Sequence, residues 1–121
     1  MADDQPGVVA IVDDDPGVLD SLKFLLEAAG HMVAAHTSAA AFLQTRAVRP
    51  CCLILDQHMP TMTGLDLAAR LRADGVDIPI LLITAQPSPA IVARAREVGI
   101  EMVLEKPLAE DDLLDFVNAH A

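Results

Sequence analysis

Short apolar runs alternate with longer amphipathic stretches along the whole chain, and this alternation constrains the fold more than any other feature. The runs are too short for helices and predict strands, which we place at residues 8–12, 32–36, 51–55, 80–83 and 101–104. Apolar residues at helical spacing follow each run. A strand followed by a helix, five times over, predicts a parallel sheet with helices on both faces.

Residues that are typical of helix ends support this division of the chain. Asp15 and Pro16 suit the N-cap and first position of a helix, and Gly30 suits its end. Right-handed crossovers leave few topologies for this element order. We therefore predict a doubly wound α/β fold of the flavodoxin-like (βα)5 type, with strand order 2-1-3-4-5. Residues 1–121 are predicted to form one domain, because neither a linker nor a repeat interrupts them.

Composition limits the partners and the compartment. The net charge of -10 disfavours binding to DNA or to anionic membranes, and favours a basic partner or a divalent cation. Cys51 and Cys52 are adjacent and lack zinc-site spacing, so they are predicted to be reduced thiols. Residues 1–7 do not resemble a signal peptide, and no apolar run reaches membrane-spanning length. A cytoplasmic location is therefore expected.

Polar residues follow four of the five predicted strands. They are Asp13 and Asp14 after the first strand, Asp56 after the third, Thr84 and Ala85 after the fourth, and Lys106 after the fifth. In an open α/β sheet, ligands bind outside the carboxyl ends of the strands, at the switch point between strands 1 and 3. These side chains are therefore predicted to form a site at one edge of the sheet.

Three converging carboxylates would raise one another's pKa unless a cation lay between them. Oxygen ligands favour Mg²⁺, and Mn²⁺, which accepts the same ligands, stays an alternative. Asp56 is the candidate nucleophile, because a carboxylate can form an acyl phosphate. The Thr84 hydroxyl and Lys106 could then hold phosphoryl oxygens, while the small Ala85 lets its backbone N–H approach.

In order and spacing, these residues resemble the response-regulator receiver family over essentially the whole chain. The matching pieces are Val12-Asp13-Asp14, Leu55-Asp56, Met59-Pro60, Gly64, Thr84-Ala85 and Lys106-Pro107. Residues 38–43 and 78–80 are most similar to the FixJ-type subgroup. The resemblance implies that Asp56 accepts a phosphoryl group from a histidine kinase or a histidine phosphotransfer protein.

The same resemblance implies further roles. Asp14 would bind the metal directly, Asp13 would act largely through water, and the backbone carbonyl of His58 would be a third protein ligand. Thr84 would be the switch hydroxyl. Lys106 would contact the phosphoryl group, and its peptide bond to Pro107 would be cis. The side chain of His58 is itself expected to face solvent.

Two features depart from the family pattern. Val103 stands where family members commonly carry an aromatic residue, so the usual aromatic switch is not expected. The chain ends one helix after Lys106, so we expect a stand-alone receiver that signals through protein contacts and does not itself bind DNA. Beyond its own phosphorylation and dephosphorylation it is not expected to be an enzyme, and homodimerisation stays open.

Two other functions stay open at this point. One is a receiver-shaped binding module that never carries phosphate. The other is a phosphatase with an aspartyl-phosphate intermediate, although such chemistry often needs a second acid where this chain has His58.

Overall fold

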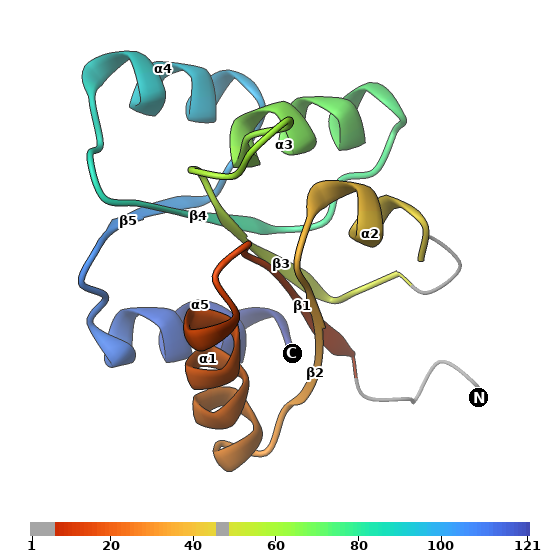
Figure 1. Cartoon of the computed structure of the whole chain (residues 1–121), viewed down its shortest axis with the longest axis vertical. Coiled ribbons are helices and arrows are strands. Elements are labelled where there is room, and N and C mark those ends of the chain that lie inside the picture. Colours follow the sequence, from red (N-terminus) through yellow and green to blue (C-terminus); the bar gives the residue numbers. More distant parts are fainter. Residues whose placement is uncertain (1–6, 46–48) are drawn as a thin grey trace.

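The computed structural model describes residues 7–45 and 49–121, and within them strands and helices alternate strictly (Figure 1). The strands are β1 (Val8–Val12), β2 (Met32–His36), β3 (Cys52–Asp56), β4 (Ile80–Thr84) and β5 (Met102–Glu105). The helices are α1 (Pro16–Ala28), α2 (Ala39–Leu43), α3 (Gly64–Ala73), α4 (Pro89–Glu97) and α5 (Glu110–His120). Residues 1–6, at which the sequence lacks the features of a signal peptide, lie outside the described part.

All neighbouring strands pair in parallel, in the order β2-β1-β3-β4-β5, which confirms the predicted flavodoxin-like topology. The register brings Val12 opposite both His36 and Leu55. On the other side of β3, Asp56 lies opposite Ile83. The carboxyl ends of the three central strands are therefore close to level, and the residues that follow them share one edge of the sheet.

Helices cover both faces of the sheet. Figure 1 shows α1 and α5 on one side of it, and α2, α3 and α4 on the other. Alternate residues of the central strands belong to the two hydrophobic cores, one on each face of the sheet. On β3, for example, Leu53 and Leu55 belong to one core, whereas Cys52 and Ile54 belong to the other. Since every residue of β3 and β4 is buried, each large apolar side chain there contributes roughly 1.5–3 kcal/mol to folding.

Side-chain caps fix where the helices begin. Asp15 accepts hydrogen bonds from the backbone N–H groups of Gly17 and Val18, which confirms it as the N-cap of α1. Ser38 and Ser88 cap α2 and α4 in the same way. Helix α5 begins without a side-chain cap, but its first turn carries three acidic residues that complement the helix dipole.

The predicted element ends differ from the observed ones by a few residues. Strand β3 was predicted at 51–55 but includes Asp56, because Asp56 still pairs with β4. Strand β5 is displaced by one residue in the same direction. Asp56 is thus held by the sheet itself rather than by a loop. Across the described ranges, 7–45 and 49–121, no helix is both long and apolar enough to span a bilayer.

Candidate functional site

Three carboxylates meet at the carboxyl edge of the sheet. Asp13 follows β1 directly and Asp56 ends β3, and both are almost fully buried, at 1% and 3% exposure. Asp14 is exposed at the mouth of the group. One carboxylate oxygen from each of the three lies within 4.8 Å of the others. The structure therefore brings together the acidic residues that the sequence singles out.

The environment of Asp13 disfavours its charge. Burial raises the pKa of its carboxyl group, and repulsion from Asp56 and Asp14 raises it further. A hydrogen bond from the Asp15 backbone N–H to Oδ1, at 2.9 Å, and the attraction of Lys106 oppose this but do not overcome it. The other oxygen, Oδ2, is buried without a hydrogen-bond partner in the described structure.

Among the described residues, Lys106 is the one cation that forms an ion pair with one of these three carboxylates. Its ammonium nitrogen lies 2.9 Å from Oδ1 of Asp56. Oδ1 is buried, and the Lys106 ammonium is its polar partner among the described residues. Burial lowers the pKa of Lys106, but its contacts with Asp56, Asp13 and Asp15 outweigh that effect and raise it overall.

A divalent cation fits this donor set. Oδ2 of Asp13 is buried without a hydrogen bond, and one ammonium cannot neutralise three carboxylates. Hard cations such as Mg²⁺ bind oxygen ligands of this kind. Asp13, Asp14 and Asp56 are the residues that would hold the ion. The backbone carbonyl of His58 as a further ligand stays a prediction.

Thr84 and Ala85 complete the edge. Thr84 is fully buried, and its Oγ1 accepts a hydrogen bond from the backbone N–H of Gln86 at 3.2 Å. Ala85 is exposed, as a residue beside an open site should be. The backbone N–H of Lys106 donates to the Thr84 carbonyl at 3.0 Å, so the ends of β4 and β5 are tied together. The Lys106–Pro107 peptide bond is cis, as the resemblance implies.

The side chain of His58 has a contact that sequence reasoning did not identify. The residue is exposed, as predicted, but its Nε2 lies 3.3 Å from Thr84 Oγ1. His58 follows β3 by two residues, and β4 is the neighbouring strand. That adjacency was available from the predicted strand order, but the direction of the imidazole was not.

Gly64 is required at the start of α3 by close packing. A Cβ at this position would lie 2.6 Å from the carbonyl oxygen of Asp56 and 2.8 Å from Leu82 Cδ1. Both distances are shorter than real contacts allow, so any side chain here would push on the backbone of the candidate nucleophile. This explains in physical terms why a glycine follows the loop after Asp56.

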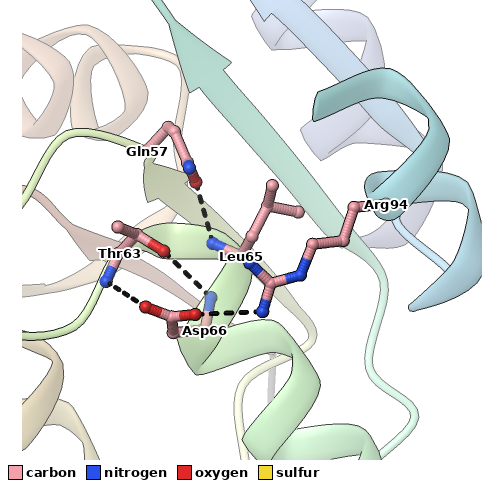
Figure 2. A network of polar contacts seen from close by, with 5 residues as sticks. All are labelled: Gln57, Thr63, Leu65, Asp66 and Arg94. Carbon is pink, nitrogen blue, oxygen red and sulfur yellow. Dashed lines mark hydrogen bonds and ion pairs between the residues drawn. The ribbon is translucent and has the colours of Figure 1, made fainter. Parts of the chain in front are cut away.

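A polar network links this region to α3 and α4 (Figure 2). Gln57 Oε1 accepts a hydrogen bond from the Leu65 backbone N–H at 2.9 Å. Thr63 and Asp66 form a reciprocal capping box at the start of α3. Asp66 also forms an ion pair with Arg94 of α4, with 2.9 Å between Oδ1 and Nη2. None of these contacts is predicted by the sequence pattern.

Val103 lies on β5, half-buried against the core that α2, α3 and α4 cover. A shallow depression of about 430 Å³ runs past it, between α4 and β5. The valine therefore fits the sheet but cannot supply the aromatic ring that this position commonly carries in receivers.

Comparisons with known proteins agree with this geometry. The model of the response regulator receiver domain family matches residues 9–118. The response regulator protein TmoT of Ectopseudomonas mendocina is 40% identical over 116 residues, which are 95% of this chain and 53% of TmoT. The transcriptional regulatory protein FixJ of Azorhizobium caulinodans is 36% identical over 92% of this chain and 53% of FixJ. The chain thus spans about half the length of these curated relatives.

Solved structures give the same result. The crystal structure of FixJ-N superposes with a TM-score of 0.85 at 33% identity, covering 94% of this chain and 92% of that one. The chemotaxis protein CheY4 of Vibrio cholerae superposes with a TM-score of 0.87 at 26% identity, covering 97% of this chain and all of that one. Sequence, fold and the acidic edge lead to one assignment: the chain belongs to the response regulator receiver domain family.

Proposed function

We propose that Asp56 accepts a phosphoryl group from a phosphohistidine, in a reaction that depends on Mg²⁺, with Mn²⁺ as an alternative. The observation that carries this proposal is the state of the Asp56 carboxylate. It is buried, it is ion-paired with Lys106, and it lies beside two further carboxylates, one of which has a buried oxygen without a hydrogen bond. Like charges this close oppose one another's ionisation, so a purely structural role does not explain the arrangement.

Each residue has a defined part in the proposed transfer. An oxygen of the Asp56 carboxylate attacks phosphorus, and the phosphorus–nitrogen bond of the donor breaks as the new phosphorus–oxygen bond forms. The leaving imidazole keeps the electron pair of the broken bond. When bound, the divalent cation would neutralise charge on the phosphoryl oxygens. Asp13 and Asp14, with the His58 carbonyl, would position that cation.

The remaining residues would bind the transferred group. Lys106 would exchange its ion pair with Asp56 for one with a phosphoryl oxygen, since both are anionic partners of the same ammonium. The Thr84 hydroxyl and the Ala85 backbone N–H would donate hydrogen bonds to the other oxygens. Thr84 must move to do so, because its present partners are Gln86 and His58.

The partners follow from the family. The donor would be a histidine kinase or a histidine phosphotransfer protein, and the phosphorylated domain would act through contacts with another protein. The acidic surface disfavours DNA as a direct ligand of this domain. A single domain over residues 1–121, the cytoplasmic location and the homodimer stay predictions. The domain would catalyse only its own phosphorylation and dephosphorylation.

Intact-mass measurement with a small phosphoryl donor tests the proposal. Acetyl phosphate with Mg²⁺ should add the mass of one phosphoryl group, and chelation of the cation should prevent the gain. Asp56→Asn should stay unmodified, whereas Asp115→Asn, an exposed change on α5, should react like the wild type. No mass gain would favour a binding module without phosphate. Repeated turnover of a phosphate ester would favour a phosphatase.

A further inference from the structure

We propose that His58 is a positioning residue that holds the Thr84 hydroxyl in the unphosphorylated arrangement and so opposes the switch. This inference rests on the proposed role of Asp56 as the acceptor. Its starting point is the 3.3 Å contact between His58 Nε2 and Thr84 Oγ1. The contact joins the loop that follows Asp56, the last residue of β3, to the end of β4.

The hydroxyl of Thr84 has limited hydrogen-bonding capacity. It has one proton to donate and can accept through two lone pairs. One lone pair accepts the Gln86 backbone N–H at 3.2 Å, and the remaining contact is with His58. Thr84 is itself fully buried, so solvent does not provide an alternative partner in this arrangement. The imidazole therefore satisfies a group that would otherwise have one hydrogen bond.

A contact made in one state and lost in another favours the first state. Because the partners of Thr84 Oγ1 are Gln86 and His58, a hydrogen bond to a group carried by Asp56 would require the hydroxyl to rotate or move. The movement breaks or stretches the contact with His58. His58 therefore weakens the response of Thr84 to a phosphoryl group by about two- to tenfold, the effect expected of one hydrogen bond.

Beryllofluoride, a mimic of the phosphoryl group, tests this inference in the full chain with saturating Mg²⁺. The chain has neither Trp nor Tyr, so the titration is followed by NMR at the Gln86 amide, whose N–H bonds to Thr84. His58→Ala should lower the dissociation constant about two- to tenfold. His58→Gln, which keeps a polar group at the same reach, should return the constant toward the wild-type value. His31→Ala, which removes a histidine bonded to Asn118 instead, should change nothing.

A double-mutant cycle separates action through Thr84 from any other effect. In a Thr84→Val background, His58→Ala should leave the dissociation constant unchanged, because the hydroxyl is already gone. Equal gains in both backgrounds, an unchanged constant for His58→Ala, or weaker binding by that variant would each overturn the inference.

A second measurement does not require the mimic to bind. Couplings in the unliganded protein should show one Thr84 side-chain rotamer in the wild type and averaged rotamers in His58→Ala. Identical couplings in the two proteins would overturn the inference. If the wild type fails to bind beryllofluoride while the couplings differ as expected, the proposed acceptor function fails and the His58–Thr84 contact stands.

Discussion

Asp13→Asn should stabilise the protein when no divalent cation is present, although it removes a residue of the proposed metal site. The substitution keeps the side-chain oxygen that accepts the Asp15 N–H, so the turn after β1 is preserved. It removes a buried negative charge that has two carboxylate neighbours within 4.8 Å. The pKa of Asp13 is raised, first by burial and then by these neighbours, so the charged form opposes folding.

The size of the effect follows from Coulomb's law. At an effective dielectric constant of about 20, two unit charges 4.8 Å apart repel by roughly 3.5 kcal/mol. Attraction to Lys106 offsets part of this, and the charge of exposed Asp14 is screened by solvent. A net gain of about 1–2 kcal/mol remains, which for a domain of this size raises Tm by roughly 3–10 °C.

The direction of the pKa shift of Asp13 also determines how folding stability depends on pH. The folded pKa of Asp13 lies above its ordinary value of 3.8, so between these two values the folded protein holds more protons than the unfolded chain. Stability contributed by this residue therefore falls as pH rises through that window, and the advantage of Asp13→Asn is complete only above it. Thermal melts at neutral pH and at mildly acidic pH should show a larger difference at neutral pH.

With Mg²⁺ present, the wild type should be more stable than Asp13→Asn. A cation that binds only the folded state stabilises it by about 2.7 kcal/mol at a hundredfold excess over Kd. Mg²⁺ should stabilise Asp13→Asn much less than the wild type, because one of the residues that would hold the ion is then uncharged. Asp115→Asn, an exposed change of equal charge, is the control and should stay within about 0.5 kcal/mol of the wild type. A less stable Asp13→Asn without cation, or an equal response to Mg²⁺, would refute the electrostatic reasoning.

Three other outcomes can be checked by denaturation. Gly64→Ala should cost about 1–3 kcal/mol and slow modification of Asp56, because its Cβ would lie 2.6 Å from the Asp56 carbonyl oxygen; wild-type stability would contradict this. Phe116→Ala should cost about 3–5 kcal/mol by leaving a cavity under α5; a loss below 1 kcal/mol would contradict this. Arg94→Gln should cost at most about 1 kcal/mol at neutral pH, because its partner Asp66 is partly exposed. The hydrogen bond from Arg94 lowers the pKa of Asp66 below its ordinary value of 3.8. The stability that this ion pair contributes is therefore present above pH 3.8 and is lost as pH falls through the folded pKa. A stability difference between Arg94→Gln and the wild type that persists below that range would count against the pairing.

The sequence predicts the fold well because strand identity here depends on local pattern. The central runs Cys52–Asp56 and Ile80–Thr84 are buried throughout, and few topologies accommodate five parallel strands with intervening helices. The acidic residues and Lys106 could be predicted for the same reason. Once the strands are parallel, everything that follows them gathers at one edge.

Contacts that depend on the direction of a side chain could not be predicted from the sequence pattern. Nothing in the local pattern indicates that the His58 imidazole reaches Thr84, or that Arg94 of α4 reaches Asp66 of α3. The spacing of Thr63 and Asp66 is readable as a capping box, but whether both hydrogen bonds form depends on the backbone geometry where α3 begins. Pairs far apart in the chain depend on helix packing, which periodicity does not specify.

Chemical trapping of the modified side chain tests whether Asp56 itself accepts the phosphoryl group. After incubation with acetyl phosphate and Mg²⁺, borohydride reduces an acyl phosphate to an alcohol, and peptide mass spectrometry then locates the change. Reduction is expected at position 56 alone, and it should be lost when the cation is chelated. Reduction at Asp13 or Asp14, or a protein that stays unmodified at every carboxylate, would contradict it.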